Sequence, residues 1–169
     1  GKNIWTLGID HNNLLWVGVI GSGIDLFDTK RGVIKRFAPD PNNPNTIQGA
    51  MVRLFYEDEE NNMWVGTSGG LSRYDSVNDS FIRYNFPNNT LSTFLMEGDD
   101  KIWIGTTSAG LFYCNLDGTL IKAYSVADGL ADNSIRGIIP GDKNNLWIPT
   151  AHGLSHLDLT EQTFRNYTK

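Results

Sequence analysis

One segment of this chain occurs four times, and that repetition constrains the fold more than any other feature. Each copy holds a tryptophan in a short apolar run, then a turn that ends in glycine, then a second short run. The tryptophans stand 48, 39 and 44 residues apart, at Trp16, Trp64, Trp103 and Trp147. Repetition of this kind is typical of small units that stack on one another, so four similar units are expected.

The register within each copy is kept without a gap. Counted from the turn glycine, the next residue is Ile or Leu, the fifth is Asp or Asn, the eleventh is Ile or Phe, and the fourteenth is Phe or Tyr. The turn glycines are Gly23, Gly70, Gly110 and Gly153. Such agreement in all four copies indicates a shared structure.

A third short run precedes each tryptophan and reads IWTLGID, VRLFYED, LSTFLME and IRGIIPG along the chain. Each copy therefore has four β-prone runs, separated by turn-forming Asn, Asp and Gly residues, and no segment shows a helical period. Four antiparallel strands in about 42 residues match one blade of a β-propeller. The predicted fold is an all-β propeller with four blades, at approximately residues 3–37, 47–84, 90–124 and 134–167. The repeated tryptophan is expected to pack between neighbouring blades.

The second copy also contains the pattern G-x-S-x-G, as Gly66-Thr67-Ser68-Gly69-Gly70. In hydrolases this pattern places a nucleophilic serine between a strand and a helix. Here the serine falls between two predicted strands, in a turn that reads VIGSG, TTSAG and TAHG in the other copies. We therefore interpret Ser68 as a turn residue and predict no catalytic residue.

The second copy resembles the two-component-regulator propeller repeat. The similarity rests on residues 62–67, on Gly70-Leu71 and Tyr74-Asp75, and on Phe81 with Tyr84. Residues 128–138, DGLADNSIRGI, resemble the family's link into a new blade. The resemblance extends over essentially the whole chain. The departures are Pro149, in place of the usual glycine, and Val19-Ile20, in place of the threonine region. Pro149 predicts a missing backbone donor in its strand.

The resemblance implies a role in signalling. In that family, proteins carry two propellers of about seven blades, an immunoglobulin-like sandwich, a membrane helix and a histidine kinase, followed by a receiver and a DNA-binding domain. Many respond to glycan fragments and control polysaccharide-utilisation genes. The chain is thus expected to be a non-catalytic periplasmic sensor module that binds an oligosaccharide. One alternative is a protein-interaction or dimerisation scaffold. The other is an enzyme similar to the streptogramin lyases, but the innermost strands lack histidine, which argues against this enzyme.

The second residue of each innermost strand is the candidate ligand-binding position. In a propeller this position should surround the mouth of the central channel, and it is occupied by Trp5, Arg53, Ser92 and Arg136. An indole suits the C–H face of a sugar, and guanidinium groups suit hydroxyls or carboxylates. The alternative is that these residues fill the channel and pair with acidic side chains of neighbouring blades.

Composition excludes several other partners. The net charge of −5 argues against nucleic acid. No apolar run reaches the roughly 18 residues of a membrane helix, so no direct membrane contact is expected. His152 and His156 would lie about 13 Å apart on one strand, and His11 lies in a turn on the other face. No metal or other cofactor is therefore predicted.

The four blades are expected to form an incomplete arc of a larger ring of about seven blades. The first predicted strand is the innermost strand of a blade, and the last is the outermost strand of another. Terminal blades of such an arc expose apolar faces, which missing blades or another copy of the chain should cover.

Overall fold

The computed structural model describes residues 3–88, 90–142 and 144–168 and places most of them in β-strands. The strands form four sheets of four antiparallel strands, each in sequence order, as the repeats predict. The chain divides into two compact units, Gly1–Asn85 and Phe86–Lys169, and each unit holds two of the sheets. The all-β prediction with four four-stranded blades is confirmed.

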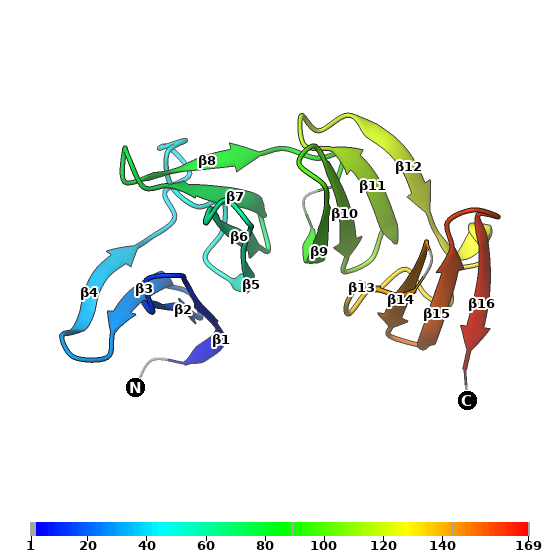
Figure 1. Cartoon of the computed structure of the whole chain (residues 1–169), viewed down its shortest axis with the longest axis horizontal. Helices are drawn as coiled ribbons and strands as arrows, with labels where there is room; N and C mark the ends of the chain where they lie inside the picture. The colour runs from blue at the N-terminus through cyan, green and yellow to red at the C-terminus, as the bar shows by residue number, and fades with distance from the viewer. Residues whose placement is uncertain (1–2, 89, 143, 169) are drawn as a thin grey trace. The chain divides into compact units, whose positions relative to one another are not determined.

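The first unit contains the sheets β1–β4 and β5–β8 (Figure 1). The first sheet consists of β1 (Ile4–Ile9), β2 (Leu15–Val19), β3 (Gly23–Asp28) and β4 (Gly32–Phe37). The second consists of β5 (Val52–Glu57), β6 (Met63–Thr67), β7 (Gly70–Asp75) and β8 (Ser80–Tyr84). The innermost strands β1 and β5 contact one another, so the two sheets pack face to face within this unit.

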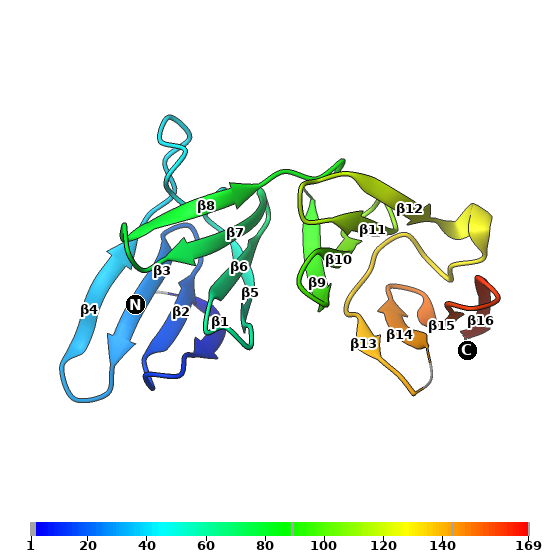
Figure 2. The same ribbon diagram turned by 45° about the horizontal axis from the view of Figure 1, so that its top comes forward.

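The second unit repeats this arrangement (Figure 2). Its first sheet consists of β9 (Leu91–Glu97), β10 (Lys101–Thr106), β11 (Leu111–Asn115) and β12 (Leu120–Tyr124). A short 3-10 helix, η1 (Val126–Asp128), lies in the link that follows. The last sheet consists of β13 (Ile139–Pro140), β14 (Asn145–Thr150), β15 (Gly153–Asp158) and β16 (Thr163–Tyr167).

The repeated turn glycine is required by a close backbone contact. Gly23 and Gly110 have φ values of 90° and 88°, in the left-handed region. A Cβ atom at either position would lie 2.2 Å from the carbonyl oxygen of the fourteenth residue onward, Phe37 or Tyr124. Any other residue would therefore meet both backbone strain and a steric clash.

Two of the four repeated tryptophans, Trp16 and Trp103, pack between sheets as predicted. In the first unit Trp16 is 2% exposed and stacks on Phe37 of its own sheet, with ring centroids 5.8 Å apart. Its other neighbours, Phe55 and Tyr74, belong to the next sheet, at 6.2 Å and 5.1 Å. In the second unit Trp103 occupies the same place in a core shared by the two sheets.

Three of the four tryptophans also donate their indole N–H to a carboxylate six residues earlier. Trp16 Nε1 donates to Asp10 at 3.0 Å, and Trp64 Nε1 donates to Asp58 at 2.8 Å. Trp103 Nε1 donates to Glu97 at 2.9 Å. The hydrogen bond satisfies a buried polar group, which would otherwise destabilise the core.

The two aspartates also hold the turn that precedes the tryptophan strand. Asp58 Oδ1 accepts from the backbone N–H of Glu60 and Asn62, while Oδ2 accepts from the indole. Asp10 divides its two oxygens between turn and indole in the same way. One carboxylate thus joins the turn to the core.

The fourth sheet departs from the others at two positions. Gly141 stands where the acidic residue would be, and Trp147 is only half-buried. Pro149 has no backbone N–H. Its carbonyl oxygen accepts a hydrogen bond from the Arg136 N–H at 2.8 Å and therefore faces the innermost side of the sheet. The missing donor therefore lies on that side, and β13 has only two residues.

We predict that Asp58→Asn destabilises the fold in a pH-dependent way. Burial acts to raise the pKa of Asp58, but hydrogen bonds from Trp64, Asn62 and Glu60 outweigh it and lower the pKa below the ordinary value of an aspartate. This stabilisation is present above the unfolded-state pKa and is lost as the pH falls through the folded-state pKa. At pH 7 the variant should lose about 1–3 kcal/mol of unfolding free energy, measured in urea.

The matched control is Glu59→Gln, which removes an exposed carboxylate from the same turn and should change stability by less than about 0.5 kcal/mol. The difference between the two variants should shrink as the pH is lowered toward 3. Equal stabilities at pH 7, or a difference unaffected by acid, would contradict the role assigned to Asp58.

Candidate functional site

The links between blades and the glycine turns lie on the same face of each sheet. A backbone hydrogen bond joins each turn to the residue that precedes the innermost strand or, in the fourth sheet, to the residue that precedes the isolated bridge at Ile135. The four bonds are Ile20 N–H to Asn3 O, Ser68 N–H to Met51 O, Thr107 N–H to Thr90 O, and Ala151 N–H to Ser134 O, at 2.9, 2.9, 3.0 and 2.9 Å. Turns and links are where function is usually placed on a rigid scaffold, so this face carries the candidate site.

Each glycine turn except the first is held by a threonine hydroxyl. Thr67, Thr106 and Thr150 donate to the carbonyl oxygens of Gly70, Gly110 and Gly153, at 3.0, 2.8 and 2.8 Å. In the first sheet Val19 stands in this place. The turns that border the site are therefore fixed by their own side chains.

Three of the four candidate ligand-binding residues lie at β-bulges. In β1, Ile4 pairs with Val19 of β2 and Thr6 pairs with the adjacent Gly18, so Trp5 has no partner residue in the strand pairing. In β5 it likewise passes over Arg53, and in β9 over Ser92. A bulged residue is released from the ladder and its side chain is re-aimed, and bulges are enriched beside functional sites.

Trp5 and Arg53 come together in the first unit. Trp5 is 55% exposed, and the Arg53 guanidinium carbon lies 6.0 Å from the centre of its ring. This is the distance of a cation–π contact. Arg53 Nε is buried and has no hydrogen-bond partner among the described residues. The pair offers an apolar ring beside a guanidinium group that still has a donor to satisfy.

Ser92 and Arg136 occupy the corresponding positions in the second unit. Ser92 Oγ is buried and unpartnered among the described residues, like Arg53 Nε. Arg136 is exposed and follows Ile135, whose bridge to Thr150 corresponds to the Val52–Thr67 pair. The shared position of the four residues was visible in the sequence, but the bulge was not.

The G-x-S-x-G pattern lies in a strand–turn–strand, as predicted. β6 ends at Thr67 and β7 begins at Gly70, so Ser68 lies in the turn between two strands of one sheet. No helix follows the serine, which removes the context of a hydrolase nucleophile.

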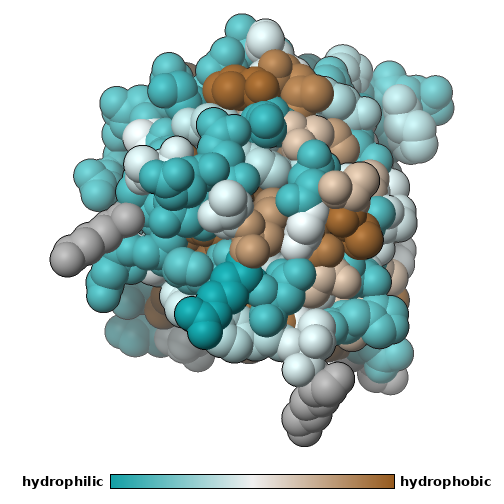
Figure 3. Space-filling view, turned by 90° about the vertical axis from the view of Figure 1, so that its right-hand side faces the viewer, coloured by the Kyte–Doolittle hydropathy of each residue, from teal (hydrophilic) through white to brown (hydrophobic). Residues whose placement is uncertain are grey.

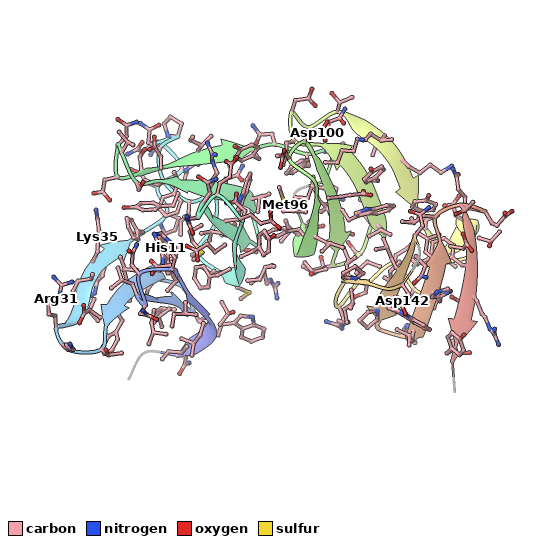
Figure 4. The ribbon with its side chains drawn as sticks, in the orientation of Figure 1. His11, Arg31, Lys35, Met96, Asp100 and Asp142 are labelled. Carbon is pink, nitrogen blue, oxygen red and sulfur yellow. The ribbon has the colours of Figure 1, made fainter. Side chains whose placement is uncertain are left out.

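The three histidines are separated and have different partners. His152 Nδ1 lies 2.7 Å from Asp132 Oδ2, in the turn between β14 and β15. His156 packs against Trp147, with ring centroids 4.4 Å apart and ring planes tilted by 50°. His11, labelled in Figure 4, lies in the turn between β1 and β2, with Nδ1 2.7 Å from Glu57 Oε1.

Two further observations bear on metals and membranes. Across residues 3–88, 90–142 and 144–168, no group of three or more His, Cys, Asp or Glu side chains is placed to hold a metal ion. In the same ranges no helix is long and apolar enough to span a bilayer.

His11 and Glu57 border a polar cavity of about 380 Å³ on the opposite face of the first unit.

Residues 46–69 match the family model of the two component regulator propeller. This part of the second blade is therefore similar to a two-component-regulator propeller repeat. The match covers the link into the second blade, β5, β6 and the start of the glycine turn. The propeller repeat thus includes Arg53 of the candidate site.

Comparison with whole proteins agrees with the repeat. A histidine kinase, P4, of Formosa agariphila is 23% identical over 94% of this chain, which spans 12% of that protein. The extracellular domains of two candidate hybrid two-component systems of B. thetaiotaomicron have similar folds. The first has a TM-score of 0.81 at 21% identity, and the match covers 98% of this chain and 25% of that chain. The second has a TM-score of 0.78 at 21% identity, and the match covers 99% of this chain and 23% of that chain. This chain therefore corresponds to a small part of its relatives.

A more distant structure supports the fold independently. The WD40 repeats of RRP9 have a TM-score of 0.73 at 7% identity, covering 99% of this chain and 51% of that chain. WD40 repeats build β-propellers. The propeller assignment thus does not depend on sequence similarity.

Proposed function

We propose that this chain is part of the periplasmic sensor region of a hybrid two-component histidine kinase and binds an oligosaccharide. The observation that carries the proposal is the Trp5–Arg53 pair, an exposed indole beside a guanidinium with an unsatisfied donor. The propeller repeat and the similarity to extracellular domains of such systems support the location. The parent protein would pass the binding signal to its kinase, which would control polysaccharide-utilisation genes.

The geometry fits saccharide binding better than packing alone. A residue that only filled the channel would have its polar atoms paired with neighbouring acids, whereas Arg53 Nε and Ser92 Oγ are buried without a partner among the described residues. Within the first unit, a saccharide would supply both an apolar C–H face for Trp5 and hydroxyl groups for the Arg53 guanidinium. No catalytic role is assigned to these residues.

The binding test uses calorimetry with a panel of neutral and acidic oligosaccharides, chosen from a glycan array. Trp5→Ala and Arg53→Ala should each lower the affinity for a bound saccharide by about tenfold or more, since anchors of this kind dominate binding energy. The control is Arg31→Ala, because Arg31 lies at the tip of the β3–β4 hairpin, away from β1 (Figure 4). Unchanged affinity in both site variants would reject the site, and no binding across the array would reject the function.

We also propose that further blades of the parent protein, or another copy of this chain, cover the outer faces of the first and last sheets. In β1, Ile4 is 59% exposed, although its counterparts Val52 and Ile135 are fully buried. Leu7 is 60% exposed, although its counterparts Phe94 and Ile138 are buried. In the last sheet Trp147 is half-buried and Tyr167 is exposed. Figure 3, which views the side that carries this sheet, shows apolar patches among hydrophilic surface.

Light scattering tests this second proposal. The isolated chain should associate as its concentration rises, and Leu7→Lys should weaken that association by placing a charge on the apolar face. A variant of the exposed turn, Val77→Lys, serves as the control because Val77 is exposed in the hairpin between β7 and β8. A chain that stays monomeric at high concentration would contradict the proposal.

A further inference from the structure

One pair of side chains on the link-and-turn face is not required by the fold. Asp132 lies on the link into the fourth blade, and His152 lies in the glycine turn of that blade. His152 Nδ1 and Asp132 Oδ2 are 2.7 Å apart, and the imidazole is 79% exposed. A carboxylate only accepts hydrogen bonds, so the imidazole donates through Nδ1. Its Nε2 atom is not used in this contact.

Comparison with the second blade shows that the scaffold does without this pair. The bonds from Ala151 to Ser134 and from Ser68 to Met51 are equivalent, and they align Asp132 with Gly49 and His152 with Gly69. These two glycines touch: a Cβ on Gly49 would lie 2.9 Å from Gly69 N. The turn-to-link hydrogen bond thus forms in the second blade with glycine at both of these positions.

The charges around the pair favour an anion. The backbone N–H of Ser134 and the imidazole of His152 lower the pKa of Asp132, and the charge of Arg136 contributes. The carboxylate is therefore ionised at neutral pH and already has its partners. The exposed His152 and Arg136 are left to present donors, and Arg136 is one of the four candidate ligand-binding residues.

We propose that His152 and Arg136, with Asp132 as the positioning residue, bind an anionic substituent, a carboxylate or a sulfate, of the saccharide. The inference rests on the proposed sensing function and names the chemical class of its ligand. Asp132 orients the imidazole through the contact at Nδ1, and Arg136 supplies a guanidinium group.

The test compares trigalacturonate with its methyl ester, which has the same sugar rings without the charges. In calorimetry, the wild-type chain should bind the acid at least about tenfold more tightly than the ester. The variant Asp132→Gly/His152→Gly reproduces the glycine contact of the second blade and should fold. It should lose about tenfold in affinity for the acid and little for the ester. N-acetylglucosamine 6-sulfate and N-acetylglucosamine form the second arm, which distinguishes sulfate from carboxylate.

A matched control is His11→Ala, which removes the imidazole from the other histidine–carboxylate pair, with Glu57, on the opposite face. It should leave the affinity for the acid unchanged. If the double glycine variant binds the acids like the wild type, or if esters and acids bind equally, this inference is overturned. If Trp5→Ala still weakens binding in that case, the sensing function stands; if no saccharide binds, both are overturned.

Discussion

The structure depends on an indole ring that is buried between two sheets and tied by its N–H to a carboxylate six residues earlier. Trp16 and Asp10 show the arrangement in full: the ring packs on both sheets, and the acid holds the turn. The apolar ring holds adjacent sheets together, while the hydrogen bond removes the penalty of burying its one polar atom. Because each unit contains this contact, a short repeat of four strands is stable only beside another.

This scaffold frees one face for binding. The links and the glycine turns are fixed by backbone hydrogen bonds that recur in every blade, so their side chains can vary without loss of the fold. The bulges in β1, β5 and β9 release one residue per blade from the ladder, and those residues are Trp5, Arg53 and Ser92. In the fourth blade the same face gains the His152–Asp132 pair.

The sequence predicted the sheets well because every blade repeats the same register, and a glycine is required wherever a carbonyl oxygen approaches, as at Gly23. It did not reveal the indole–carboxylate bonds, since acids in turns already have a sufficient explanation. The signal was present: an acid precedes the tryptophan by six residues in three copies, and Gly141 replaces it in the fourth. The sequence did not reveal the bulges. It also did not reveal the His152–Asp132 pair, because residues 20 positions apart in separate turns carry no periodic pattern.

Exchange of the indole N–H protons with solvent tests the central claim most directly, because NMR resolves each tryptophan side chain. The N–H groups of Trp16 and Trp103 should exchange slowly, since both rings are buried and donate to Asp10 and Glu97. Those of Trp5 and Trp147, which are exposed or half-buried, should exchange rapidly. Similar rates for all of these side chains would show that the indoles do not hold the sheets together.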